Sequence, residues 1–422
     1  MVLLKNEAST LCRIAMKICH VVPIYLPGVL PGCSKYVQGI SSILSGKGHH
    51  VTILTANAIT GRGWVDPVFG RYSPKTEEMI NGVRVKRLKT QWQMTSTNYL
   101  LNRPFGRFFP SSIRNISALL SAGPYLPNLK KEFENGKYEV IHVTAFPFAL
   151  VSLVWKACKA LGNPFVCTPL IHFEDPNHRN PLLWKALKDA AAVVACSNYE
   201  KERMTRMGVH PSKIYLIPMG INLEEWEDSD GERFRRKYGL TGKRLLLFVG
   251  TKNYNKGAIH LLQAMNDIRQ NVKDLVLVSL GLSTKEWKKK KGILPEGNLL
   301  DLGYVSEKEK RDAFDACDLF AMPSRYDSFG IVYLEAWRCG KPVIGAKVGA
   351  IPEVIEEGKD GLLVEFGEVD QLASAIISLL NNPDLCREMG EAGRKKVIDK
   401  FNWQKNIGKI EEVFKGAKVE WR

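Results

Sequence analysis

The sequence lacks any apolar run long enough to form a membrane-spanning helix. Such a helix needs about 20 residues, and no apolar stretch approaches that length in this chain. The first residues are interrupted by Lys5, Glu7, Arg13 and Lys17, so they do not form the unbroken apolar core of a signal peptide. We therefore expect a cytoplasmic protein that does not span a membrane.

Paired cysteines and metal-ligand spacings are also missing. The nine cysteines are scattered and mostly flanked by apolar residues, and no C-x-x-C motif occurs. Such cysteines are typical of reduced, buried small hydrophobes in a cytosolic protein. The eight histidines do not cluster with them, and the adjacent pair His49-His50 precedes a strand pattern. We expect no structural metal and no cofactor.

Acidic residues are absent from one long segment, Met79 to Lys131. Six aromatic residues lie between its nine basic residues, which are Arg84, Lys86, Arg87, Lys89, Arg103, Arg107, Arg114, Lys130 and Lys131. Basic side chains mixed with interfacial aromatics suit an anionic membrane surface. The alternative is a solvated loop and helix with ordinary core aromatics. No recognised nucleic-acid module accompanies the charge, so we expect no nucleic-acid partner.

The chain does contain a regular alternation of strand and helix patterns over 422 residues, more than one ordinary domain holds. In the first half, apolar runs predict strands at 15–23, 50–55, 83–88, 140–143, 165–168, 192–196 and 214–217. In the second half, they predict strands at 245–249, 275–280, 299–302, 319–322, 342–345 and 361–364. Because strands that alternate with helices form mostly parallel sheets, we predict two doubly wound, Rossmann-like α/β domains facing a central cleft.

The boundary between these domains falls in a polar, charged and glycine-bearing stretch at 218–241. At the far end of the chain, apolar residues recur at helical spacing; they are Phe401, Trp403, Ile407, Ile410, Val413 and Phe414. We therefore predict an N-terminal domain at 1–217, a C-terminal domain at 218–400 and a final helix at 401–422.

Two carboxylates, Asp327 and Glu335, stand eight positions apart around a Ser-Phe-Gly turn. The spacing predicts a short buried helix over 330–338, with Asp327 just ahead of it. A helix start offers free backbone N–H groups and a partial positive charge, which suit a phosphate. Carboxylates accept hydrogen bonds from hydroxyl groups in pairs, so one can bind a sugar and the other a ribose diol.

A second pattern, LLLFVGTKNYNKG at 245–257, joins an apolar strand, a glycine, a short polar loop and a lysine that enters a helix. This order places Lys256 at the carboxyl end of a strand and beside a helix start. An open α/β sheet binds its ligand at that position. The pattern therefore predicts that Lys256 meets an anionic group.

Together the two patterns resemble glycosyltransferase family 4, retaining nucleotide-sugar enzymes of the GT-B fold. Its signature is E-x7-E around Phe-Gly, followed by G-G-x-P-E; here Asp327 replaces the first Glu, and G-A-I-P-E runs from Gly349 to Glu353. The resemblance implies that Glu335 binds the ribose and Asp327 the donor hexose, with Glu353 as a further candidate. It also implies donor contacts from Ser328, Phe329, Gly330 and Ile331.

The resemblance implies that Lys256 holds the donor pyrophosphate, within a donor loop that includes Gly250. The family usually has Arg directly after this glycine, whereas this chain has Thr251 followed by Lys252. Arg binds phosphate through a rigid fork and Lys through a single charge. Lys252 is therefore a candidate replacement with different geometry.

The first half resembles the family at three places. Gly32 occupies the place of the second glycine in the family's G-G, where a residue without a side chain lets the backbone approach donor or acceptor. His172 follows the strand that carries the family's active-site histidine, which implies a catalytic role beside Lys256 and Asp327. His142 is a further candidate. A plain turn for Gly32 and structural roles for the histidines are the alternatives.

The resemblance implies transfer of a hexose from a UDP- or GDP-sugar to an acceptor hydroxyl. No metal is expected, because Lys256 and the helix start can neutralise the diphosphate. Residues 1–220 hold 27 Lys and Arg against 12 Asp and Glu, which favours a lipid-linked, glycoconjugate or polysaccharide acceptor at the cytoplasmic face of a membrane. A GT-B epimerase and a non-catalytic GT-B scaffold, suggested by Thr251 and Asp327, are the alternatives.

Overall fold

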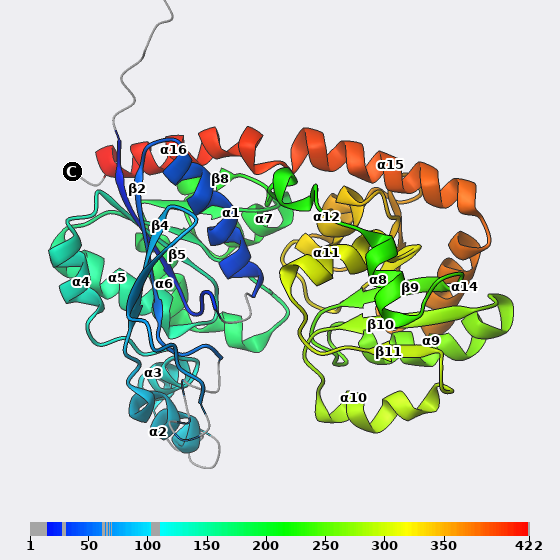
Figure 1. The fold of residues 1–422 in the computed structure, drawn as a ribbon. Coiled ribbons are helices and arrows are strands. Elements are labelled where there is room, and N and C mark those ends of the chain that lie inside the picture. Colours follow the sequence, from blue (N-terminus) through cyan, green and yellow to red (C-terminus); the bar gives the residue numbers. More distant parts are fainter. Residues whose placement is uncertain are drawn as a thin grey trace, which may run out of the picture.

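Two sheets of mostly parallel strands, each flanked by helices, form two neighbouring domains (Figure 1). The computed structural model describes residues 15–27, 31–60, 70–102 and 110–420, together with Trp64, Asp66 and Val68. The strands predicted from apolar runs are present, with ends shifted by a residue or two, because strands buried on both faces are continuous apolar segments. The predicted α/β fold class is confirmed.

The first domain contains an eight-stranded sheet in the order β3-β4-β2-β1-β5-β6-β7-β8. Its strands are β1 (Lys17–Val22), β2 (His50–Ala56), β3 (Glu77–Ile80), β4 (Val83–Leu88), β5 (Val140–Thr144), β6 (Phe165–Thr168), β7 (Ala192–Ala195) and β8 (Ile214–Leu216). Its helices are α1 (Gly32–Gly46), α2 (Trp92–Asn102), α3 (Ser111–Ser121), α4 (Leu129–Gly136), α5 (Ala149–Leu161), α6 (Pro181–Asp189) and α7 (Asn198–Arg206). The edge strand β3 pairs antiparallel with β4.

The second domain contains a six-stranded parallel sheet in the order β11-β10-β9-β12-β13-β14. Its strands are β9 (Arg244–Val249), β10 (Leu275–Leu280), β11 (Leu299–Asp301), β12 (Leu319–Ala321), β13 (Val343–Ala346) and β14 (Gly361–Val364). Its helices are α8 (Gly231–Tyr238), α9 (Ala258–Asn271), α10 (Lys285–Lys290), α11 (Glu307–Ala316), α12 (Ile331–Arg338), α13 (Ile351–Val354), α14 (Val369–Leu380) and α15 (Pro383–Lys400). The strand order reverses between β9 and β12, which is where such sheets bind ligands.

The segment at 79–131 is more regular than the loop and helix considered from the sequence. Its start completes β3, a polar edge strand that lacks an apolar run, and β4 follows it. The helices α2 and α3 then pack against each other at the lower edge of the first domain in Figure 1. Arg103 and Arg107 lie outside the described residues.

The last helix, α16 (Trp403–Glu420), returns to the first domain, as predicted. It contacts α1, β5 and β6, and Figure 1 shows α15 and α16 along one side of both domains. Its own residues Trp403 and Phe414 are buried. The buried His49 ring, whose Nε2 lies 2.8 Å from Glu411 Oε1, ties this helix to the start of β2.

The two segments that connect the domains are paired with each other. One follows β8, and the other joins α15 to α16. The N–H of Ile221 donates to the carbonyl of Phe401 at 2.9 Å, and the N–H of Trp403 donates to the carbonyl of Ile221 at 3.2 Å. A Cβ at Gly220 would lie 2.9 Å from the Phe401 carbonyl oxygen, so this crossing requires glycine.

A fully buried histidine pair lies beneath α16. The Nδ1 atoms of His20 and His142 are 2.9 Å apart, and Nε2 of His142 lies 2.9 Å from the Thr168 hydroxyl. Two neutral rings of opposite tautomer satisfy this contact, whereas two imidazolium rings would repel each other. Burial lowers the pKa of His20 to about 3 and that of His142 well below its usual range.

We predict that this pair makes the first domain sensitive to acid. Both histidines bind protons more readily when unfolded, with pKa values near 6.5. The contribution of the pair to the unfolding free energy is therefore fully present above about pH 6.5. It is lost as the pH falls towards 3, by up to about 1.4 kcal/mol per pH unit for each ring. His20→Gln should reduce the slope of unfolding free energy against pH by about one proton, measured by urea denaturation. His210→Gln, at an exposed site, should retain the wild-type slope; equal slopes in both variants would contradict the prediction.

Candidate functional site

The loop after β9 contains a position that only glycine can occupy. Gly257 has φ of +76°, and an added Cβ would lie 2.2 Å from the carbonyl oxygen of Pro323, in the loop after β12. Asn253 Oδ1 accepts the Lys256 N–H at 2.8 Å, which folds the loop back before α9 begins at Ala258. The loops after β9 and β12 are thus held in contact.

This contact brings together Lys256 and Asp327. The Lys256 ammonium donates to Asp327 Oδ2 at 2.9 Å and to the carbonyl of Tyr326 at 3.1 Å. The Asp327 side chain is 12% exposed, and its Oδ1 accepts the Phe329 N–H at 3.3 Å. Burial alone would raise the pKa of Asp327, but the charge and hydrogen bond of Lys256, the charge of His172 and the Phe329 N–H together outweigh burial and lower it. The Asp327 carboxyl is therefore ionised, and the pair is partly open to solvent.

His172 approaches the same pair from the first domain. Its ring stacks on His178 at a centroid distance of 5.2 Å, and His178 Nδ1 accepts the His172 backbone N–H at 3.1 Å. Burial and the Lys256 ammonium lower the pKa of His172, while Asp327 acts in the opposite direction. Lys256 and Asp327 in the second domain therefore act electrostatically on His172 in the first domain. These are the three residues with an expected catalytic role.

The predicted helix after Asp327 is α12. Gly330 precedes it with φ of +81°, and an added Cβ would lie 2.4 Å from the Tyr333 ring, so glycine is required at this turn. Phe329 is buried with its ring 5.5 Å from that of Phe401. Ser328 is half-buried, and Ile331 and Glu335 line a cavity between the domains.

Glu335 is buried inside α12 and neutralised by two lysines. Its Oε1 accepts from Lys310 of α11 at 2.8 Å and from Lys35 of α1 at 3.1 Å. One of these cations comes from each domain. The carboxylate expected to bind ribose is therefore placed at the domain junction.

Lys252 is turned away from Lys256 into the interior of its domain. Its side chain is fully buried, and its ammonium donates to Asp301 Oδ1 at 2.6 Å and to the carbonyl of Leu302. Trp287 and Lys291 complete the surroundings of Asp301. In this structure Lys252 holds β11 to the loop after β9, and it does not present its charge beside Lys256. Gly250 and Thr251 lie half-buried at the end of β9.

The remaining candidates have different positions. Glu353 accepts the N–H groups of Asn198 at 2.7 Å and Tyr199 at 2.5 Å, so this second-domain carboxylate binds the start of α7 in the first domain. His142 is fully buried with both ring nitrogens bonded, so neither reaches the domain junction. Gly32 opens α1, and an added Cβ there would meet no atom within 4 Å.

Several residues at the junction carry no signal in the sequence. Lys35 and Lys310 belong to amphipathic patterns that predict exposed lysines, and their shared partner lies far along the chain. Tyr333 donates its hydroxyl to the Met322 carbonyl at 2.7 Å and fixes α12 against β12. An aromatic residue at this position predicts burial, but it does not predict which backbone carbonyl its hydroxyl binds.

The described residues contain no group of three or more His, Cys, Asp or Glu side chains arranged to hold a metal ion. The eight cysteines among them are free thiols. None of the described helices is both long enough and apolar enough to cross a membrane.

We predict opposite shifts in the pKa of His172 from two substitutions. Lys256→Met removes a nearby cation and should raise this pKa, whereas Asp327→Asn removes a nearby anion and should lower it. A titration of the histidine ring signals by NMR measures both. Lys243→Met removes an exposed lysine that pairs with Asp274 and should leave the His172 pKa unchanged. Shifts of the same sign in the first two variants would contradict the geometry.

Two family descriptions match consecutive parts of this chain. The description "Glycosyltransferase Family 4" matches residues 32–225. The description "Glycosyl transferases group 1" matches residues 230–396. The two matches therefore cover the first and second domains in turn.

Curated relatives include two synthases and a mannosyltransferase. The alpha-maltose-1-phosphate synthase of Mycolicibacterium smegmatis is 29% identical over 54% of this chain and 64% of its own length. The GDP-mannose-dependent alpha-(1-6)-phosphatidylinositol monomannoside mannosyltransferase of that organism is 28% identical over 54% of this chain and 63% of its own. The matches thus span less than two thirds of these relatives. The glycogen synthase of Mycobacterium tuberculosis H37Rv is 24% identical over 96% of this chain and 95% of its own.

Solved structures share the whole architecture. The sucrose-phosphate synthase of Thermosynechococcus elongatus aligns over 94% of this chain and 98% of its own at 21% identity, with a TM-score of 0.72. HepE of Anabaena, in complex with UDP and glucose, aligns over 95% and 99% at 17% identity, with the same TM-score of 0.72. These likenesses show the GT-B fold. The two family matches, which together span most of residues 32–396, show that the chain belongs to glycosyltransferase family 4.

Proposed function

We propose that the protein is a retaining glycosyltransferase that moves a hexose from a UDP- or GDP-sugar to an acceptor hydroxyl. The observation that carries this proposal is the Lys256–Asp327 ion pair at the carboxyl ends of β9 and β12, whose two charges act on the pKa of His172. The similarity to a GDP-mannose-dependent mannosyltransferase supports it. The start of α12 lies directly after this pair and provides further backbone N–H groups.

In the proposed reaction, the bond between the anomeric carbon and the diphosphate oxygen breaks, and a bond to the acceptor oxygen forms. Negative charge grows on the departing diphosphate, which takes up the proton that the acceptor hydroxyl loses. Lys256 is assigned to stabilise that charge, and removal of such a contact commonly costs about 10²–10³-fold in rate. Asp327 is assigned to the hexose hydroxyls. Lys256 and the α12 start act on the diphosphate without a metal.

We predict that Lys256→Ala lowers turnover by about 10²-fold or more, because the leaving diphosphate loses its cation. Donors are first selected by thermal shift with UDP- and GDP-sugars, and release of UDP or GDP is then measured with simple sugar and lipid acceptors. Lys243→Ala, at an exposed lysine on the opposite end of β9, should retain wild-type turnover. Activity of Lys256→Ala within twofold of wild type would reject the role.

The same measurements distinguish the two alternatives. An epimerase would change the donor hexose without net transfer to an acceptor. A non-catalytic scaffold would bind the nucleotide sugar and release no nucleotide in any condition. The anomeric configuration of the product, measured by NMR, tests retention.

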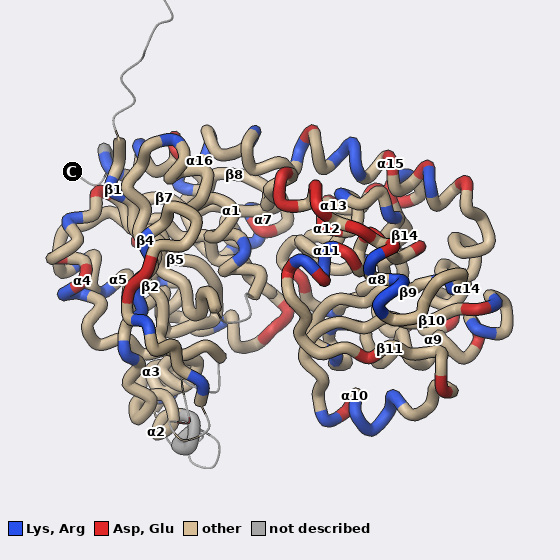
Figure 2. The backbone as a smooth tube through the Cα atoms, viewed as in Figure 1, with Lys and Arg blue, Asp and Glu red and all other residues tan. Residues whose placement is uncertain are grey.

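We further propose that α3 contacts an anionic membrane at the cytoplasmic face, where a lipid-linked acceptor would be presented. Three cations of the 79–131 segment are neutralised by acids in or beside the sheet: Arg84 by Glu77, Arg87 by Glu78 and Lys86 by Glu132. Among the described residues, Lys89, Arg114 and Lys131 have no acidic partner. On α3, Arg114 lies between Ile113 and Ile116, which are 50% and 46% exposed. Figure 2 shows basic residues at the lower edge of this domain.

We predict that replacing Ile113, Arg114 and Ile116 together with Ser weakens binding to anionic vesicles while donor binding is retained. Each basic residue near such a surface contributes about 1 kcal/mol, and salt weakens the attraction. Co-sedimentation with anionic and neutral vesicles at low and high salt measures the effect. Arg84→Ser removes a cation already paired with Glu77 and should change little. Equal binding of wild type to both vesicle types would reject the contact.

A further inference from the structure

A buried carboxylate with one occupied and one open oxygen lies at the domain junction. Glu335 is 3% exposed. Its Oε1 accepts from both Lys310 and Lys35, whereas Oε2 is buried without a hydrogen-bond partner among the described residues. A buried carboxylate oxygen without a donor is costly. The open oxygen is thus suited to accept a hydrogen bond from a ligand.

The cavity that Glu335 lines identifies where this ligand group would lie. Its volume is about 40 Å³, and its walls come from α1, the linker after β8, α11 and α12. Trp226 and Ile331 form apolar parts of the wall. This space holds a water molecule but not a ribose ring, so a nucleoside requires the domains to separate there.

Lys310 remains beside Glu335 when the domains separate, because both residues belong to the second domain. It also pairs with Glu307 at 2.6 Å and lies 5.9 Å from the centroid of the Trp226 ring. Burial alone would lower the pKa of Lys310, but the carboxylates of Glu335 and Glu307 outweigh burial and raise it. Lys310 is therefore a permanent cation at this carboxylate. Lys35 belongs to the first domain and leaves Glu335 on opening.

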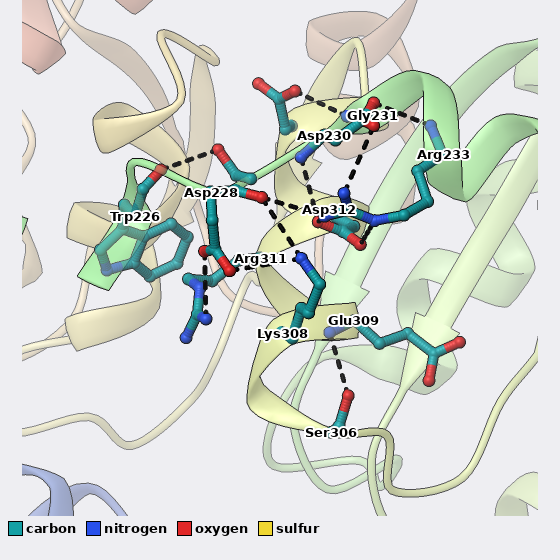
Figure 3. Close-up of polar contacts among 12 residues, drawn as sticks. Trp226, Asp228, Asp230, Gly231, Arg233, Ser306, Lys308, Glu309, Arg311 and Asp312 are labelled. Carbon is teal, nitrogen blue, oxygen red and sulfur yellow. Dashed lines mark hydrogen bonds and ion pairs between the residues drawn. The ribbon is translucent and has the colours of Figure 1, made fainter. Parts of the chain in front are cut away.

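The helix that carries Lys310 is also held by charge contacts with the segment that leads into α8 (Figure 3). Asp312 of α11 accepts from Arg233 Nε at 2.7 Å and from the Asp230 N–H at 3.0 Å. Lys308 and Arg311 both pair with Asp228. These contacts attach α11 to the segment that enters α8, so the position of Lys310 is set before any ligand binds.

We propose that Lys310 is a positioning residue for the donor nucleotide. It holds Oε1 in an ion pair and leaves Oε2 directed to a ribose hydroxyl. This inference rests on the proposed function, in which Glu335 binds the donor ribose. Because Lys310 acts through Glu335, its loss should affect recognition of the ribose hydroxyls and leave the diphosphate contacts in place.

The test compares a nucleoside diphosphate with its 2′,3′-dideoxy counterpart by calorimetry, using whichever of UDP and GDP the wild type binds. A charge-assisted hydrogen bond to the ribose should give the wild type a preference of about tenfold or more for the ribose form. Lys310→Met should reduce this preference to within about twofold. Lys243→Met, which removes a lysine from an exposed pair with Asp274, should retain it.

The double variant Glu335→Gln/Lys310→Met removes one charge of each sign, so it leaves no unpaired buried charge if Lys310→Met alone fails to fold. The preference of the double variant for the ribose form over the dideoxy form should equal that of Glu335→Gln. A further loss in the double variant would mean that Lys310 touches the nucleotide itself and would overturn the positioning role. An equal loss of affinity for both nucleotides in Lys310→Met, with the preference intact, would overturn it too. Failure of the wild type to bind UDP or GDP would instead reject the proposed function together with this inference.

Discussion

The parallel pairing of β9 with β12 is the constraint on which the site depends. Both strands end at the same edge of the sheet, and the chain leaves them in loops that contact each other through Gly257 and the Pro323 carbonyl. A cation at the end of one loop therefore meets a carboxylate at the end of the other. Without this adjacency, Lys256 and Asp327 would be two unrelated polar residues separated by 71 positions.

Features coded by nearby residues could be predicted from the sequence. Buried strands such as β7 are uninterrupted apolar runs, and α12 follows its glycine at the expected place. The family resemblance implies a shared catalytic role for Lys256, Asp327 and His172, and in the structure Lys256 pairs with Asp327 and both charges act on His172. The edge strand β3 escaped prediction because its residues, Glu77–Ile80, form no apolar run and depend on β4 for pairing.

The direction of a long charged side chain could not be predicted, because it depends on partners distant in sequence. Lys252 resembles a donor-loop cation, but Asp301, 49 positions later, draws it into the interior. Glu335 receives Lys35 from 300 positions away. His142 is retained in the core by His20, which lies in a neighbouring strand. In each case, the sequence identifies a polar group and the sheet order selects its partner.

The pairing of the two interdomain segments has a mechanical consequence. Ile221 and its partners Phe401 and Trp403 form a short hydrogen-bonded ribbon. Such a ribbon resists deformation within its own plane and bends more easily perpendicular to that plane. Relative motion of the domains is therefore confined largely to bending about one axis. The first domain would then follow one path when it moves away from the second domain and back. Along that path the contact of Lys35 with Glu335 and the contact of the α7 start with Glu353 would form together.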